Sequence, residues 1–144
     1  MSRKVNFSHQ TEIQIRFNDI DIMEHVNNSV YQNYFDLART KYFEHVFNQK
    51  MNWKEQALVL AKITIEYLNP VFIDENICVR TKVYKLGNKS LNMVQQLINK
   101  DSKELKAEND AILVAFSHKE NNTTNLPEHW RKAIRDYEND PSLI

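Results

Sequence analysis

The feature that most constrains this fold is one long helix with a broad apolar face, expected from Ser29 to about Val46. Apolar residues recur through it at intervals of three and four, namely Val30, Tyr34, Leu37, Ala38 and Tyr42. Further aromatic residues widen this face. A helix at the surface of a domain needs only a narrow apolar stripe to contact its core. The broad face therefore indicates a helix that the rest of the chain covers on several sides.

The segments around this helix alternate with a period of two, which is typical of strands. Before the helix, TEIQIRF (11–17) is expected to place Ile13, Ile15 and Phe17 on one face. After it come four strand-like segments, LVLAKITIEYL (58–68), ICVRTKVYKL (77–86), SLNMVQQLINK (90–100) and AENDAILVAFSHK (107–119). In the first of these, the alternation predicts one apolar face made of Val59, Ala61, Ile63, Ile65 and Tyr67. Pro127 is expected to begin a short closing helix.

The separators GNK (87–89) and DSKE (101–104) limit how the strands are connected. Both suit hairpins between antiparallel strands and are too short for a parallel crossover. The four later strands are therefore expected to form a meander. One apolar-faced helix and one antiparallel sheet must bury each other, which predicts an α+β fold with a five-stranded sheet curled around the helix. The sequence shows no repeat or linker, so residues 1–144 are expected to form one domain.

Composition excludes several classes of function. The 19 basic and 19 acidic residues give a formal net charge of zero without a basic stripe, so no nucleic-acid partner is expected. Gly87 is the one glycine, whereas dinucleotide-binding fingerprints, Walker loops and nucleophile elbows each need at least two glycines close together. The five histidines lack the spacing of metal ligands, so no metal or cofactor is expected.

The sequence also bears on the compartment. The lone Cys78 cannot form an internal disulfide, and it is expected to be a small buried apolar residue. The first ten residues lack the apolar run of a signal peptide, and no later segment is apolar enough to span a membrane. A cytoplasmic protein is therefore expected.

The junction before the long helix holds more polar residues than a helix start needs. Asp19, Asp21, His25, Asn27 and Asn28 lie within it, although one capping residue usually suffices. The first N–H groups of a helix are free, and its dipole leaves partial positive charge there. An oxyanion formed from a carbonyl would be stabilised at this point, and a nearby carboxylate is able to activate water or attack the carbonyl.

The segment RFNDIDIMEHVNNSVYQNYFDLAR (16–39) resembles the signature of the hotdog-fold acyl-CoA thioesterases of the 4-hydroxybenzoyl-CoA thioesterase type. That signature is a strand ending in Asp-x-Asp, a turn, His-Val-Asn-Asn, and a helix carrying Tyr and a later Arg. The resemblance continues through IEYLNPVFIDENICVRTKV and LGNKSL and covers nearly the whole chain. It implies a hotdog fold and hydrolysis of a fatty or aryl acyl-CoA to the free acid and coenzyme A.

The resemblance also implies roles for particular residues. Asp21 would attack the thioester carbonyl or activate water, the backbone N–H of Asn28 would polarise that carbonyl, and His25 belongs to the same catalytic motif. For substrate binding, Lys89 and Ser90 lie where the family places a basic cluster for the nucleotide of coenzyme A, and Tyr31 would line the acyl channel. Similar proteins form homodimers or homotetramers with the channel between protomers.

Three points stay open at this stage. Plant acyl-acyl-carrier-protein thioesterases share Asp-x-x-x-His-Val-Asn-Asn, so an acyl carrier protein is an alternative to coenzyme A. A non-catalytic acyl-binding hotdog module is another alternative. Glu24 stands where the bacterial pattern usually has glycine, and a turn that needs a positive φ, or a close approach of the substrate to the backbone, would disfavour a side chain there. Asp19 is expected to form the turn rather than to act as a second catalyst.

Overall fold

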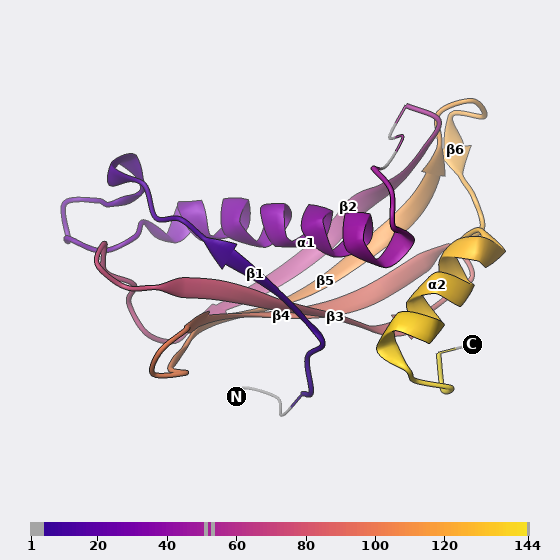
Figure 1. The fold of residues 1–144 in the computed structure, drawn as a ribbon. Helices are drawn as coiled ribbons and strands as arrows, with labels where there is room; N and C mark the ends of the chain where they lie inside the picture. The colour runs from indigo at the N-terminus through magenta and orange to yellow at the C-terminus, as the bar shows by residue number, and fades with distance from the viewer. Residues whose placement is uncertain (1–4, 51, 53, 144) are drawn as a thin grey trace.

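The computed structural model describes residues 5–50, 52 and 54–143. Its elements are β1 (His9–Ile13), the short 3₁₀ turns η1 (Phe17–Asp19) and η2 (Asn28–Val30), α1 (Tyr31–Phe47), β2 (Gln56–Tyr67), β3 (Ile77–Leu86), β4 (Ser90–Asn99), β5 (Leu105–Ser117), β6 (Asn122–Thr123) and α2 (Glu128–Glu138). The antiparallel sheet curls around α1, and α2 packs at the end where α1 finishes (Figure 1). This is the expected α+β hotdog architecture.

The order of the strands differs from the expected meander. The sheet runs β1-β3-β4-β5-β2, with the short β6 paired to β5. Of the four strands expected in the meander, β3, β4 and β5 follow one another as hairpins, because their separators are short. The longer segment 68–76 lets the chain leave β2 and return at the other side of the sheet. β2 therefore pairs with β5, from Gln56 opposite Ser117 to Tyr67 opposite Ala107, and forms an edge.

The prediction of which β2 residues form the apolar face is wrong for the first half of the strand. The register with β5 shifts between Leu60 and Lys62, which is the mark of a β-bulge. The bulge adds a residue and exchanges the faces, so Leu58 is buried whereas Val59 is 46% exposed. Ile63 packs against the core and lies beyond the bulge. A period of two read across the whole strand misses this exchange.

The first strand is also shorter and earlier than expected. β1 spans His9–Ile13, and the chain then turns at η1. Phe17 is 84% exposed and does not share the buried face of Ile13. The turn forms because Asp19 accepts hydrogen bonds from the backbone and side chain of Arg16, which competes with continued strand pairing.

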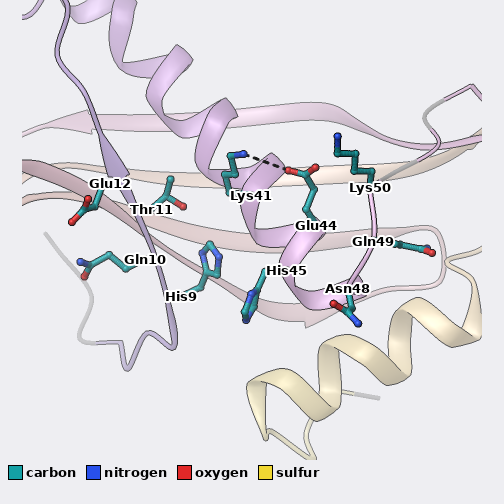
Figure 2. Close-up of a pocket in the computed structure, with 10 residues that line it drawn as sticks. All are labelled: His9, Gln10, Thr11, Glu12, Lys41, Glu44, His45, Asn48, Gln49 and Lys50. Atoms are coloured by element: carbon teal, nitrogen blue, oxygen red, sulfur yellow. Dashed lines mark ion pairs between the residues drawn. The ribbon is translucent and has the colours of Figure 1, made fainter.

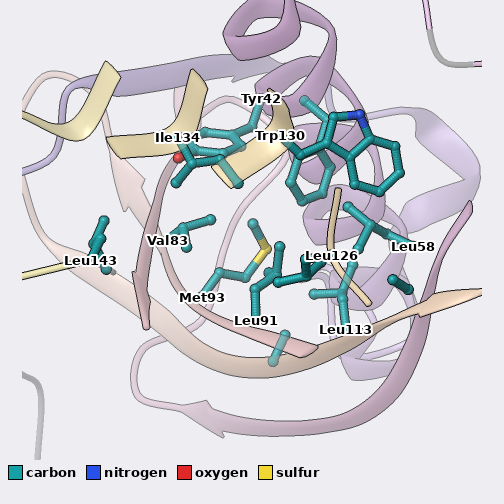
Figure 3. Packing of buried hydrophobic residues seen from close by; sticks show 13 residues of the cluster. Tyr42, Leu58, Val83, Leu91, Met93, Leu113, Leu126, Trp130, Ile134 and Leu143 are labelled. Atoms are coloured by element: carbon teal, nitrogen blue, oxygen red, sulfur yellow. The ribbon is translucent and has the colours of Figure 1, made fainter. Parts of the chain in front are cut away.

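Two apolar clusters hold α1 on the sheet. Figure 3 shows the cluster under the C-terminal half of α1, where Tyr42 and Trp130 lie above Leu91, Met93 and Leu113. The second cluster lies under the N-terminal half and contains Tyr31, Tyr34, Phe35, Ala38, Val71, Val79 and Leu97. Cys78 is buried, as expected. Because both halves of α1 are packed, the position of its N-terminus is set by the core.

A buried polar contact further fixes α1 over β4. The Arg39 guanidinium donates to Gln95 Oε1 at 3.0 Å, and Gln95 Nε2 donates to the Phe35 carbonyl at 3.0 Å. Arg39 also pairs with Asp36 on its own helix. Burial lowers the pKa of Arg39 to about 10, so the group remains charged at neutral pH. Within the described residues, no helix is both long and apolar enough to cross a membrane.

Candidate functional site

Asp19 anchors the turn that precedes α1. Its side chain is only 1% exposed, and Oδ2 accepts hydrogen bonds from the Tyr34 hydroxyl at 2.6 Å and from Arg16 N at 3.0 Å. The Arg16 guanidinium contacts the other oxygen at 3.0 Å. Burial by itself would raise the pKa of Asp19, but the hydrogen bonds from Tyr34 and Arg16 hold it below its ordinary value. Asp19 therefore forms the turn, as the sequence predicts.

Replacing Asp19 with Ala should lower the free energy of unfolding by about 2 kcal/mol or more, because the buried Tyr34 hydroxyl loses its acceptor. A depressed native pKa stabilises the fold above the unfolded pKa, and this contribution disappears as pH falls through the native value. Urea denaturation at neutral pH and in acid tests both effects. The difference between wild type and variant should shrink in acid, and Tyr34→Phe should cost less in the Asp19→Ala background than alone.

Asp21 lies two residues further on, where its carboxylate meets solvent. Its backbone N–H donates to the His25 carbonyl at 3.1 Å, and its Oδ1 accepts the Met23 N–H at 2.8 Å. These two bonds hold the residue on a tight turn and orient one carboxylate oxygen. The other oxygen has no hydrogen-bond donor among the described residues. Asp21 is thus a positioned carboxylate with an oxygen available to a ligand.

Glu24 occupies the position where the family usually has glycine. Its φ of 67° lies in the left-handed region, which a side chain other than glycine adopts at a cost. The turn therefore does require the positive φ that the glycine pattern predicts. The Glu24 N–H donates to the Asp21 carbonyl at 3.0 Å, so the two residues are held at a fixed separation.

The start of the helical segment lies beyond this turn. The helix starts later than expected, since η2 precedes α1, and Asn27 is the capping residue that accepts the Ser29 N–H at 2.9 Å. The backbone N–H of Asn28 has no acceptor among the described residues, as is usual for the first N–H groups of a helix. The Asn28 carbonyl accepts the Tyr67 hydroxyl at 3.1 Å, which ties this end of the helix to β2.

A cavity of about 820 Å³ opens beside Asp21. Its walls are apolar, and carboxylates lie among them: the lining residues are Phe17, Ile20, Asp21, Glu24, Phe72, Ile73 and Asp74. His25 does not line it, but its ring packs edge-on against Phe72 at a centroid distance of 5.9 Å. Asn28 is likewise outside the lining. We refer to this space as the Asp21 cavity, and its volume is in the range of small-molecule sites.

The loop after β2 supplies residues that the sequence did not indicate as part of the site. Phe72, Ile73 and Asp74 reach the cavity because the Val26 N–H donates to the Val71 carbonyl at 2.8 Å, which joins the two loops. The only signal in the sequence was that the family resemblance continues through IEYLNPVFIDEN. Alternation and spacing carry no information about contacts between these loops.

The residues expected to bind substrate, Tyr31, Lys89 and Ser90, do not line the Asp21 cavity. Tyr31 is 2% exposed in the core, where its ring packs against Tyr67 at 5.1 Å and burial raises its pKa to about 12. Lys89 and Ser90 lie at the β3–β4 turn. That turn contacts the segment leading into α2, since the Leu126 N–H donates to the Asn88 carbonyl at 2.9 Å. This is the end of the molecule where α1 finishes, opposite the loop that leads from β1 into α1 (Figure 1).

A second cavity, of about 780 Å³, lies between β1 and the C-terminal end of α1. Figure 2 shows His9 and His45 near each other, with their ring centroids 5.4 Å apart, and an ion pair between Lys41 and Glu44. Burial, together with the neighbouring His45, lowers the pKa of His9. The C-terminal end of a helix carries partial negative charge, which disfavours an oxyanion. This cavity is therefore the poorer candidate for carbonyl chemistry.

Among residues 5–50, 52 and 54–143, no group of three His, Cys, Asp or Glu side chains is arranged to hold a metal ion.

Comparison with known proteins gives consistent matches. Residues 15–134 match the model of the thioesterase-like superfamily. The acyl-CoA thioester hydrolase YbgC of Escherichia coli O6:H1 is 26% identical over 92 residues, which cover 62% of this chain and 69% of that protein. The uncharacterized protein YsmA of Bacillus subtilis is 29% identical over 90 residues, and the match spans 60% of its length.

A solved structure matches over nearly the whole chain. A thioesterase of Thermus thermophilus, crystallised with coenzyme A and Zn, superposes with a TM-score of 0.81 and 29% identity. The match covers 94% of this chain and 97% of the other.

Proposed function

This chain belongs to the thioesterase-like superfamily, and we propose that it hydrolyses the thioester bond of a fatty or aryl acyl-CoA. The observation that carries the proposal is Asp21, a positioned carboxylate with a free oxygen beside a cavity with apolar walls. The activity named for YbgC and the coenzyme A in the Thermus structure support acyl-CoA as the substrate. Because acyl-CoA is made and used inside cells, this activity implies a cytoplasmic location.

The proposed reaction uses Asp21 in one of two ways. As a general base, it takes a proton from water while the water oxygen bonds to the thioester carbon. The C–S bond then breaks, the sulfur receives the proton, and the products are the free acid and the coenzyme A thiol. As a nucleophile, Asp21 itself bonds to that carbon and displaces the thiolate, and water then hydrolyses the resulting anhydride.

The start of the helical segment supplies the second part of the proposed site. The Asn28 N–H, at the positive end of the helix dipole, would donate to the carbonyl oxygen as negative charge develops on it. Tyr67 supports this role because its hydroxyl donates to the Asn28 carbonyl, in the peptide group that follows the one carrying the Asn28 N–H, and so limits movement of this residue. His25 would have a positioning role: its carbonyl accepts the Asp21 N–H, and its ring packs against Phe72 of the cavity lining.

A homodimer is part of the proposal. β2 is a twelve-residue edge strand, and long unpaired edges favour association with another strand. Leu37, Val59 and Tyr67 are apolar residues on α1 and β2 that remain substantially exposed. Pairing of β2 with its copy would cover them through one two-fold contact. It would also bring a second chain to a cavity of about 250 Å³ between α1 and β2, which Arg39, Phe43 and Leu58 line with others.

Lys89 and Ser90 are proposed to contact coenzyme A phosphates. Because the β3–β4 turn lies at the opposite end of the molecule from the loop that precedes α1, such a contact to the same substrate is most simply made from the partner protomer. A phosphate contact remote from the thioester binds the ground state and the transition state alike. It therefore acts mainly on KM.

Replacing Lys89 with Ala should raise KM for an acyl-CoA several-fold, with a smaller effect on kcat. The effect should fade as salt rises, because an exposed charge pair is screened. Steady-state kinetics at low and high NaCl measure both. An unchanged KM at low salt would instead favour a phosphate site elsewhere, or an acyl carrier protein as the substrate.

The experiment that tests the proposed function is thiol release from a panel of acyl-CoA and acyl-carrier-protein thioesters. Release from acyl-CoA supports the proposal, and release only from acyl carrier protein favours that carrier. If the protein binds acyl-CoA but releases no thiol from any thioester, the non-catalytic acyl-binding module is correct.

A further inference from the structure

The charges around the Asp21 cavity bear on which half of the substrate it holds. Asp21, Glu24 and Asp74 contribute three carboxylates, and none of the described residues that line the cavity is Lys, Arg or His. Neither Glu24 nor Asp74 forms an ion pair with another described residue. The nucleotide half of coenzyme A carries several phosphate charges, which such a cavity would repel. The acyl half suits the apolar walls formed by Phe17 and Phe72.

Glu24 is the carboxylate most closely linked to Asp21. The hydrogen bond from its N–H to the Asp21 carbonyl, at 3.0 Å, sets its place on the turn. Its side chain lines the same cavity as the Asp21 side chain. A glycine at position 24 would remove this carboxylate and leave Asp21 and Asp74 as the charged residues of the lining. A group bound next to Asp21 therefore meets a second carboxylate that a glycine-containing turn would not present.

We propose that the Asp21 cavity holds the acyl half of the thioester and that Glu24 is a specificity-determining residue that excludes acyl groups with a free carboxylate. This inference rests on the proposed acyl-CoA hydrolysis and deepens it. Discrimination arises by repulsion: an anionic acyl group brings a like charge into a site with apolar walls, where charges are screened less than in water. Neutral fatty and aryl acyl groups carry no such penalty.

Hexanoyl-CoA and adipoyl-CoA provide a matched pair of substrates, because they have the same chain length and adipoyl-CoA ends in a carboxylate. The quantity to measure is the ratio of kcat/KM for hexanoyl-CoA to that for adipoyl-CoA. Wild type should strongly favour hexanoyl-CoA. Glu24→Gln should lower the ratio by about five- to tenfold, and Glu24→Lys should lower it further, as the local charge becomes neutral and then positive.

Two controls separate local charge from general effects. Glu120→Gln makes the same chemical change at an exposed turn outside the Asp21 cavity, and it should leave the ratio unchanged. Raising NaCl from about 0.05 to about 0.5 M should reduce the wild-type ratio, because salt screens a partly exposed repulsion. The same salt change should have less effect on the ratio in Glu24→Gln.

Each outcome has a definite meaning. An unchanged ratio in Glu24→Gln and Glu24→Lys, with hexanoyl-CoA hydrolysed, overturns this inference and leaves the proposed function in place. Equal falls in KM for both substrates in Glu24→Gln would show that the coenzyme A phosphates pass Glu24, which also overturns it. If wild type releases thiol from no acyl-CoA of the panel described above, the proposed function fails and this inference fails with it.

Discussion

Replacing Asp21 with Asn should lower kcat for acyl-CoA hydrolysis by about a hundredfold or more, because the site loses its base or nucleophile. The fold should be unaffected. Among the described residues, the Asp21 side chain has one hydrogen bond, from the Met23 N–H at 2.8 Å, and the Asn side-chain oxygen is able to accept it. Thiol release measures kcat, and thermal unfolding measures stability.

The matched control for this variant is Asp101→Asn. Asp101 lies on the exposed turn between β4 and β5, where it accepts a hydrogen bond from Asn76 at 3.2 Å. The Asp101→Asn variant should retain wild-type kcat, which would show that removing one acidic charge does not by itself lower the rate. A rate near that of wild type in Asp21→Asn would mean that another group activates water. A loss of rate accompanied by unfolding would assign Asp21 a structural role.

The second large effect concerns the proposed homodimer. The double variant Leu37→Lys/Val59→Lys should be monomeric at micromolar concentration and should lose more than about tenfold in kcat/KM. Leu37 is 45% exposed on α1 and Val59 is 46% exposed on β2, so neither substitution should disturb the core of one chain. Charged residues on an edge strand oppose edge-to-edge pairing, and lysine is the residue that natural edges use most.

Sedimentation equilibrium and enzyme kinetics on the same samples test the dimer. Ser8→Lys/Gln10→Lys is the control, since it adds two lysines at exposed positions beside and within β1, at the opposite edge of the sheet from β2, and should leave both assembly and activity unchanged. A wild type that is monomeric and fully active at micromolar concentration would rule out a site shared between protomers. A double variant that remains dimeric would place the interface elsewhere.

Much of the candidate site was predictable because its signals are local. The positions of Asp19 and Asp21, the polar turn and the following helix are adjacent in sequence, and the family resemblance lies there. The glycine that the pattern usually has indicated either a positive φ at position 24 or a close approach of the substrate to the backbone. The structure bears this out with a φ of 67° at Glu24.

The order of β3, β4 and β5 was likewise determined by the sequence, since GNK and DSKE allow only hairpins. The long helix was determined by its period and its broad apolar face. In both cases the information lies within a few residues, because turn length and side-chain period are properties of the local backbone.

Only the tertiary structure decided the rest. The partner of β2 depends on which edge remains free after the hairpins close, and its bulge between Leu60 and Lys62 depends on the register with β5. The burial of Asp19 depends on Tyr34, fifteen residues away on α1. The Asp21 cavity needs Phe72, from a loop brought close by the contact between Val26 and Val71. These features depend on contacts between segments distant in sequence, and no local period or spacing encodes such contacts.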